Sequence, residues 1–224
     1  MRIMSMHKST RDMEAGTPPP REVMEGMGPL MGEMMQAGIF VAGEGLRPSS
    51  LGVRLQFTSG KRTITKGPLR GDNELVSAYA IVKTASIDEA IEFASRSAAP
   101  DAVIDVRPVA EPWDFGAPRP ANETKTRYMV IYKADARSES GTKPAEIRDP
   151  LVIDSARLQP SSKGRRLHFR GGKLTVTDGP FTESKELIAG FSILEVPSIE
   201  AAVPWAVRFA KLLGDIEIEM RPMY

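Results

Sequence analysis

The chain has 224 residues, of which 41% are hydrophobic and 26% are charged, and its 30 basic side chains nearly balance its 29 acidic ones. This composition excludes a disordered or collagen-like chain, and the absence of cysteine excludes a disulfide framework. No segment reaches the ~18 uninterrupted apolar residues of a membrane span, and the polar start lacks the apolar core of a signal peptide. We expect a soluble, cytoplasmic protein without a membrane or nucleic-acid partner, because a net charge of +1 attracts neither.

The first half of the chain predicts the element order β-α-β-β-β-α-β. Apolar runs and period-two alternation indicate strands, and methionines spaced three and four residues apart indicate the first helix. That helix follows a proline run and ends before Gly38, and Pro29 inside it predicts a kink or a broken turn. The predicted elements are strand 2–8, helix 20–37, strands 53–58, 61–65 and 77–84, a helix beginning at Ile87, and strand 103–109.

The second half predicts the same strands but a shortened first helix. Only 17 residues separate Gly141 from Leu158, whereas 30 separate Gly16 from Leu46, so about 13 residues are missing where the first half has its helix. We therefore expect one face of the second sheet to be thinly covered. Pro204 predicts a distortion in the last helix. The predicted strands are 127–134, 165–170, 173–177, 188–196 and 216–220.

An internal repeat explains this parallel. LRPSSLGVRLQFTSGKRTITKGP begins at Leu46 and LQPSSKGRRLHFRGGKLTVTDGP begins at Leu158, and about 22 of 51 aligned positions are identical from there on. A repeat of this length predicts two copies of one small α+β domain, with helices on one face of an antiparallel sheet. We assign residues 1–115 to the first copy and 127–224 to the second, joined by the proline-bearing linker 116–126.

Three motifs resemble a known family. They are TVTDGPFTESKELIAGFSILEV at 175–196, VAGEGLRPSS at 41–50 and VRP at 106–108. Together they resemble the YCII-related family, in the branch named for its Asp-Gly-Pro-Phe motif, over nearly the whole chain and once per copy. The resemblance implies ferredoxin-like domains that pair so that their sheets form an α/β barrel. This chain would then hold two ferredoxin-like repeats as a pseudo-dimeric barrel.

The two copies keep different parts of the family pattern. Asp178 belongs to the Asp-Gly-Pro-Phe motif of the second copy, whereas the first copy has Lys-Gly-Pro-Leu at 66–69. Glu44 belongs to the GEGL segment of the first copy, which the second copy replaces at 155–158. One hypothesis is a composite cleft in which Asp178 and Glu44 act as catalytic acid–base residues. The alternative is that Asp178 is a turn residue, since Asp-Gly-Pro has the chemistry of a turn.

Four more residues are candidates for ligand binding. Arg107 and Arg221 take matching places before a proline of the last strand, where they would hold an anionic ligand or pair with carboxylates. His7 and His168 are the two histidines, and each has a ligand-binding or a structural interpretation. Relatives are thought to use a histidine–aspartate pair, but this chain has no histidine in its first helix. Two histidines without cysteine predict no metal site, and the glycine-rich segments lack the pattern of a cofactor-binding phosphate loop.

The function stays open between two classes at this point. The resemblance favours a cleft between the copies for a small, anionic or lactone-like molecule, with isomerase- or lyase-like acid–base chemistry. Its family context implies instead a non-enzymatic regulatory or accessory protein associated with an extracytoplasmic-function sigma factor. The eroded symmetry of the motifs also fits a remnant with only a binding or structural role.

Overall fold

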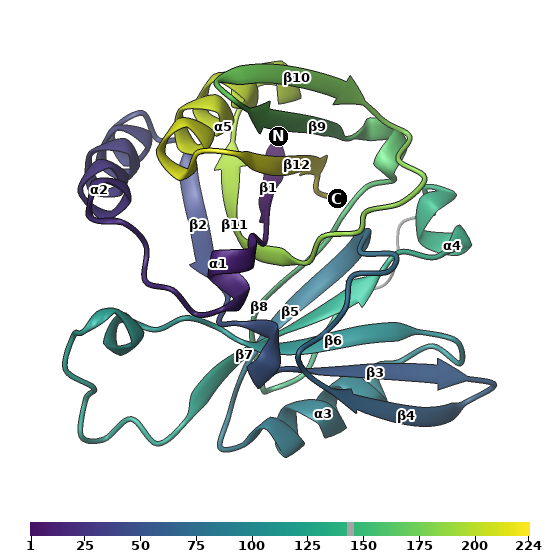
Figure 1. Cartoon of the computed structure of the whole chain (residues 1–224). Helices are drawn as coiled ribbons and strands as arrows, with labels where there is room; N and C mark the ends of the chain where they lie inside the picture. The colour runs from purple at the N-terminus through teal and green to yellow at the C-terminus, as the bar shows by residue number, and fades with distance from the viewer. Residues whose placement is uncertain (143–145) are drawn as a thin grey trace.

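The structure is a computed structural model that describes residues 1–142 and 146–224. Two six-stranded sheets pack face to face and form the upper and lower layers of Figure 1. Sheet I has the order β10-β9-β12-β1-β11-β2, with β1 (Arg2–Lys8), β2 (Phe40–Gly45), β9 (Arg165–Arg170), β10 (Lys173–Asp178), β11 (Ile188–Glu195) and β12 (Ile216–Pro222). Sheet II has the order β4-β3-β6-β7-β5-β8, with β3 (Val53–Thr58), β4 (Lys61–Lys66), β5 (Val76–Thr84), β6 (Val103–Pro108), β7 (Thr126–Lys133) and β8 (Val152–Arg157).

Each sheet combines strands from both halves of the chain. In sheet I, β1 of the first half lies between β11 and β12 of the second, and β2 extends the sheet beyond β11. In sheet II, β7 of the second half lies between β5 and β6 of the first, and β8 extends the sheet beyond β5. The first two strands of each half are therefore paired with the last four strands of the other half. Residues 116–125, which connect the halves and are all described, run as turns and irregular chain.

Helices cover the outer faces of the sheets. The helices α2 (Arg21–Gln36) and α5 (Ile199–Leu213) lie on sheet I, and α3 (Ile87–Arg96) lies on sheet II (Figure 1). Short turns complete the chain: α1 (Arg11–Glu14), α4 (Ala136–Glu139), η1 (Ser49–Leu51), η2 (Pro112–Phe115) and η3 (Ser161–Lys163). Ser86 and Ser198 cap α3 and α5 by accepting bonds from Glu89 N and Ala201 N.

The pairing of each half's first two strands with the other half's last four, here called the strand exchange, corrects the expectation that the second half's sheet is the thinly covered one. The thinly covered face belongs to sheet II, which holds strands β3 to β6 of the first half, because α2 lies on sheet I with the second half's strands. Ile147 and Leu151 pack beside α3 and cover part of that face. Pro144, which belongs to the same shortened segment, lies outside the described residues. The chain between β7 and β8 thus supplies by loop packing some of what a second helix would supply.

Most predicted elements are present within one or two residues, and both hairpin turns form as expected. Ser59 and Gly60 have φ values of +49° and +78°, and Gly171 and Gly172 have +54° and +75°, the left-handed pair that a two-residue hairpin requires. Two predictions were wrong in detail. The strands β2 and β8 were missed, because β2 contains Gly43 and Gly45 and β8 contains Asp154, residue types that are rare in strands. The broken turn expected at Pro29 is absent, since α2 runs through it without interruption, as α5 runs through Pro204.

The layer between the sheets is filled by side chains. Its centre is apolar and includes Met4 and Met6 from sheet I and Tyr79, Met129 and Ile131 from sheet II. Charged side chains of the same inner faces lie around this centre, among them the buried Lys8, Asp105 and Glu219. Charged groups that are cut off from water need partners nearby, so the way each of these is paired indicates where the molecule carries a site.

Candidate functional site

Lys133, at the end of β7, belongs to a fully paired group of buried charges. Its Nζ lies 2.8 Å from Asp105 Oδ2 and also donates to the Glu74 carboxylate. Arg54 completes the group, with Nε 2.7 Å from Asp105 Oδ1 and Nη2 2.6 Å from Glu74 Oε1. Both carboxylates are at most 1% exposed. Two cations and two anions hold one another here, which is the arrangement that makes buried charge tolerable.

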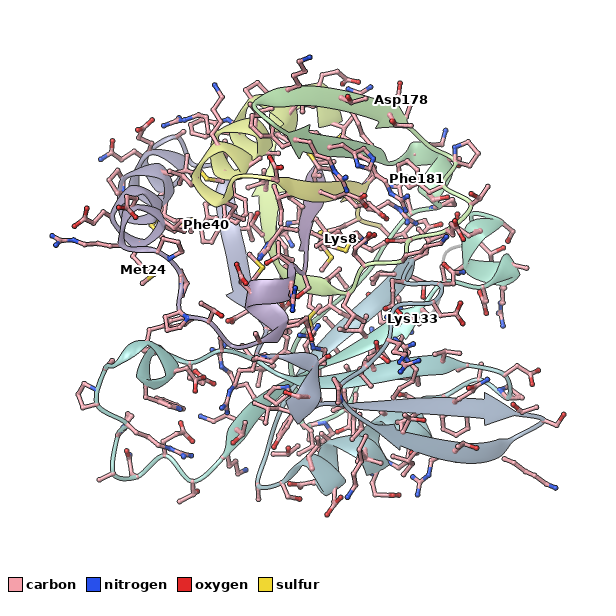
Figure 2. The ribbon with its side chains drawn as sticks, in the orientation of Figure 1. Lys8, Met24, Phe40, Lys133, Asp178 and Phe181 are labelled. Carbon is pink, nitrogen blue, oxygen red and sulfur yellow. The ribbon has the colours of Figure 1, made fainter. Side chains whose placement is uncertain are left out.

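Lys8, at the end of β1, has the same place in sheet I but is not paired in the same way. Lys8 is opposite Ile188 of β11, as Lys133 is opposite Val76 of β5. The side chain is 2% exposed, and Nζ has no hydrogen-bond partner among the described residues. The nearest carboxylate is Glu219, at 3.6 Å, and it already accepts two bonds from Arg166. Figure 2 shows Lys8 and Lys133 in the layer between the two sheets.

The missing partner can be traced to one glutamate. The residue that aligns with Glu74 in the repeat is Glu186, but it is exposed instead of buried. The two loops touch each other, since Glu74 N donates to Ser184 O at 2.7 Å. The Glu74 carboxylate turns inward, where it also accepts from Asp72 N at 3.2 Å. The loop before β5 therefore supplies a carboxylate to Lys133. The loop before β11 supplies none to Lys8 and leaves that acceptor position unfilled.

Burial lowers the pKa of Lys8 from its ordinary value of 10.5. The positive charges of Arg166 and Lys133 lower that pKa further, while Glu219 and Glu217 raise it without restoring the ordinary value. The amine therefore loses its proton at a lower pH than a surface lysine does. A buried amine of this kind can bind an anion, take up a proton or act as a nucleophile.

A cavity of about 200 Å³ opens beside Lys8. It lies between the end of β1, the inner side of β9, the start of β12 and the loop before β11, so both halves of the chain contribute to it. His168 and Arg170 line it from β9, and Glu217 lines it from β12. His168 Nδ1 is 3.2 Å from Glu217 Oε2. The cavity thus has in its walls a lysine, an exposed arginine, an imidazole–carboxylate pair and the exposed carboxylates of Glu186 and Asp215.

Asp178 and Glu44, the two carboxylates of the composite-cleft hypothesis, are not brought together. Asp178 ends β10 at one edge of sheet I, and Glu44 lies on β2 at the opposite edge. Five interstrand spacings, or roughly 24 Å, separate these two strands. Glu44 accepts a bond from Arg127, which also binds Glu111 at 2.7 and 2.9 Å. The composite cleft is therefore not formed. The acid–base roles of the individual residues stay predictions.

The Asp-Gly-Pro-Phe segment forms a tightly packed turn. A Cβ on Gly179 would lie 1.9 Å from Ser161 O, so only glycine fits there. Phe181 N donates to Ser161 Oγ at 3.1 Å, and the Phe181 ring lies beneath the Arg166 guanidinium at 4.1 Å. Arg166 in turn holds Glu219, the carboxylate nearest to Lys8. The motif thus supports the candidate site from behind, as a turn and a packing element.

Asp178 itself is expected to contribute little to stability or to ligand binding. Its side chain is 71% exposed and forms a pair with Arg165 Nε at 2.6 Å, at the outer edge of sheet I (Figure 2). An exposed ion pair is worth ~0.2–1 kcal/mol, so Asp178→Asn should lower the free energy of unfolding by no more than that. Urea unfolding measures the change. A loss of several kcal/mol would contradict the surface role.

Arg107 and Arg221 are structural in this geometry. Each is 1% exposed. Arg107 donates to Ile188 O at 2.6 Å and lies 3.3 Å from Glu14. Arg221 donates to Gln159 O and lies 3.1 Å from Glu139. The Nη atoms of both guanidinium groups bond to the protein, although Arg107 Nε has no hydrogen-bond partner among the described residues, and this favours the carboxylate-pairing interpretation over a ligand anchor.

His7 lies outside the cavity. Its ring faces α5, with its centroid 5.2 Å from that of Phe209, and burial lowers its pKa to about 4. The folded protein therefore binds this proton only below pH 4, whereas the unfolded chain binds it below about 6.5. Stability should fall as the pH drops from 6.5 to 4, by up to about 3 kcal/mol from this group.

The pH dependence of unfolding tests this assignment of His7. The midpoint of urea unfolding is measured between pH 4 and 7 for the natural chain and for His7→Gln, whose side chain does not titrate. The natural chain should lose more stability over this range than the variant. Parallel curves would contradict a buried, neutral His7.

The cavity's lysine and arginine were missed in the sequence. Lys8 closes an opening strand in which Met4 and Met6 share its face, a pattern that places a charge in a buried row. The matching Lys133 repeats that signal. The matching lysines were the available clue in the sequence. Whether each lysine has a hydrogen-bond partner depends on the orientations of Glu74 and Glu186, which the spacing of residues does not predict.

This architecture defines a mixed α+β protein with two antiparallel sheets, which is compatible with a ferredoxin-like YCII fold. Residues 126–211 match the YCII-related domain. An uncharacterised protein of Rhizobium meliloti (strain 1021) is 37% identical over 51 residues, which are 23% of this chain and 41% of that relative. The chain thus spans about two fifths of the length of the curated relative that it matches. No solved structure matches significantly.

The YCII-related match runs across both sheets. It includes β7 and β8 of sheet II, then β9 to β11 and α5 of sheet I. Among the described residues, no helix is long and apolar enough to cross a membrane. Within the same residues, no three His, Asp or Glu side chains are grouped as a metal site would require.

Proposed function

We propose that this protein binds a small organic acid in the cavity beside Lys8. The observation that supports this is Lys8, which lines the cavity and whose buried Nζ has no hydrogen-bond partner among the described residues. A buried donor left unpaired costs roughly 1–3 kcal/mol, and more if it is charged. A ligand that brings an acceptor oxygen removes that cost on binding.

An internal comparison indicates the chemistry of the ligand. Lys133 is held by Asp105 and by the Glu74 carboxylate, whereas Lys8 has only Glu219 at 3.6 Å. A ligand carboxylate in the cavity would stand to Lys8 as Glu74 stands to Lys133. Arg170 adds an exposed cation to the same cavity. A volume of about 200 Å³ is small beside the ~300–1,000 Å³ of sites for drug-sized ligands, so it suits a molecule of a few carbons.

The same cavity has the groups that proton transfer needs. His168 Nδ1 is 3.2 Å from Glu217 Oε2, and a carboxylate at this distance orients an imidazole. This pair supports isomerase- or lyase-like acid–base chemistry on the bound acid, in which a proton is removed next to a carbonyl group. It replaces Asp178 and Glu44 in that proposal.

We also propose that the chain is a tandem duplication of the Asp-Gly-Pro-Phe branch. Residues 1–115 and 127–224 are then repeats that exchange their first strands to form a pseudo-dimeric barrel. The identical order of the two sheets supports this, with β1 in the place of β7. Gly67 and Gly179 also meet equivalent serine carbonyls, since a Cβ on either would lie 1.9 Å from one. The bridges Leu46–Val109 and Leu158–Met223 join the sheets at both sides.

Association with a sigma factor is the second candidate, and ligand binding ranks above it. A docking surface for a protein would need apolar side chains gathered on one face. The exposed large apolar side chains include Met24 and Met35 on α2, Ile64 on β4, Ile153 on β8 and Val176 on β10. They are spread over α2 and three strands of the two sheets, whereas the cavity gathers its charged groups at one place.

Titration with small acids tests the ligand proposal. Propionate and lactate are added to the ¹⁵N-labelled full chain at constant ionic strength, and amide shifts are followed by NMR. We expect saturable shifts at the ends of β1 and β9 and the start of β12. Lys8→Met should abolish them. The matched control Lys61→Met changes an exposed lysine on β4 and should leave them unchanged.

Two outcomes would contradict the proposal. One is the absence of saturable shifts with either acid. The other is equal binding by the natural chain and Lys8→Met, which would place the ligand elsewhere. Circular dichroism of each variant establishes that it is folded, so that lost binding reports on the site.

A further inference from the structure

The strand β10 is an open edge of sheet I. Within the part of the chain that the structure describes, it pairs with β9 on one side and with no strand on the other. All six of its residues are exposed, and Figure 1 shows the strand at the top of the molecule. An open edge presents unpaired backbone N–H and C=O groups, to which a further strand can bind.

The equivalent edge of sheet II, β4, is protected by charge, whereas β10 is not. The β4 sequence KRTITK has three basic side chains and no acidic one, so two copies of it side by side would repel. Natural proteins use lysine on edge strands to prevent such pairing. The β10 sequence KLTVTD has one basic and one acidic side chain. Of these two hairpin edges, β10 is therefore the one that can meet a second copy of itself.

Two apolar side chains of β10 lack a full cover. Leu174 is opposite Phe169 of β9. Val176 is opposite Leu167. Facing residues of antiparallel strands share one side of the sheet, and both β9 residues belong to the core beneath α5. Leu174 and Val176 thus continue that core past the helix, where they are 39% and 44% exposed. A partner strand with apolar side chains on the same face would cover them.

We propose that two copies of this chain associate by antiparallel pairing of β10 with β10, with Thr175 of one copy opposite Thr175 of the other. Residues of an antiparallel strand bond alternately to its two sides. Because Arg170 and Lys173 close a two-residue hairpin, the N–H and C=O groups of Leu174 and Val176 point away from β9. In the proposed pair, Leu174 of each copy exchanges both backbone bonds with Val176 of the other.

The side chains favour this register over its neighbours. A two-fold axis keeps each face of the sheet on one side, so the register can shift only to the next residue of the same row. Centred on Thr175, it places Leu174 against Val176 twice and gathers four apolar side chains on the outer face. Centring the axis on Val176 would place Leu174 against the carboxylate of Asp178. Centring it on Leu174 would place Val176 against Gly172, which has no side chain to cover it.

The interface is small and closes after two copies. A single strand edge buries less than the ~1,200 Å² of a standard interface, so the dimer should dissociate on dilution. The same patch serves both copies, which leaves no β10 edge free for a third. The association needs no ligand in the cavity beside Lys8, so it is independent of the proposed function.

Sedimentation velocity of the full chain tests the association between about 10 μM and about 1 mM, the range of weak interfaces. The mass should rise from 24.5 kDa toward twice that value. Val176→Lys should weaken association at least about tenfold, because it places a cation against apolar Leu174 and near its own copy. The matched control is Ile64→Lys on β4, whose residue aligns with Val176 and is 41% exposed. It should associate like the natural chain.

Oxidative cross-linking tests the register. The chain has no cysteine, so a single substitution introduces a single thiol. Facing residues that share no backbone bonds have Cα atoms about 4.5 Å apart, a distance that a disulfide spans. Thr175→Cys should therefore form a disulfide-linked dimer under mild oxidation. Thr63→Cys, the aligned position of β4, should cross-link at least about tenfold more slowly.

Four outcomes would overturn the proposal. The first is a natural chain that stays monomeric at the highest concentration, which would leave the edge free or to a different protein. The second is association that Val176→Lys does not weaken, and the third is equal cross-linking of the two cysteine variants. The fourth is growth beyond a dimer, as expected if β10 paired with β4 of the next copy in an open chain. Circular dichroism establishes that each variant is folded.

Discussion

Replacement of Lys8 by methionine is expected to stabilise the folded protein by about 1–3 kcal/mol at pH 7. The side chain is 2% exposed and its Nζ has no hydrogen-bond partner among the described residues. Glu219 keeps Arg166 and Arg221 after the change, so no carboxylate is left unpaired. Methionine has nearly the length of lysine and joins Met4 and Met6 on the same face of β1.

Urea unfolding of the natural chain and of Lys8→Met measures this gain. The gain should shrink above pH 7, because the unfolded lysine then loses its proton too. Since the folded pKa is below the unfolded one, the natural chain becomes more stable as the pH rises toward 10.5. A clear loss of stability in Lys8→Met at pH 7 would show that Lys8 is a structural cation.

The same substitution at Lys133 is expected to have the opposite sign and a larger size. Lys133→Met should cost about 3–5 kcal/mol, because it leaves two buried carboxylates to one cation. Asp105 and Glu74 would then share Arg54 alone, and both are cut off from water. Lys8→Met and Lys133→Met are a matched pair, since both lysines end a central strand of their sheet.

Chemical denaturation at pH 7 compares the two variants directly. If the folded fraction of Lys133→Met is too small, Lys133→Arg keeps the charge and gives a smaller loss. Equal effects of the two methionine substitutions would contradict the difference between Lys133, which is held by two carboxylates, and Lys8, whose Nζ has no hydrogen bond.

The sequence predicted nearly all of the secondary structure, because hydrophobic period and turn residues act locally. The hairpin at Ser59-Gly60 and the cap at Ser86 formed as expected. The repeat predicted two equivalent halves, and the sheets do have equivalent orders. What local patterns do not determine is which sheet a strand joins. Strand β1 fits between β11 and β12 by its buried face, and its own half would offer it a similar place.

The candidate site could not be predicted from sequence motifs, because its residues come from different halves of the chain. The most distinctive motif, at Asp178, forms a packed turn, which was one of the two interpretations that its sequence allowed. The cavity instead depends on Lys8 from one half and His168 and Glu217 from the other, which only the strand exchange brings together. Its chemistry then depends on the outward orientation of Glu186, a single side chain in a loop.

The central claim is that the buried amine of Lys8 has no hydrogen-bond partner in the protein and that a bound carboxylate supplies one, and one measurement tests it most directly. Lysine ¹³Cε resonances of the full chain are followed by NMR from pH 6 to 11, and Lys8→Met assigns the Lys8 signal. Without ligand, Lys8 should titrate below the ordinary ~10.4 of the surface lysines. With saturating propionate, its pKa should rise, because a bound carboxylate favours the ammonium form. A Lys8 signal that titrates with the surface lysines and ignores propionate would contradict the account.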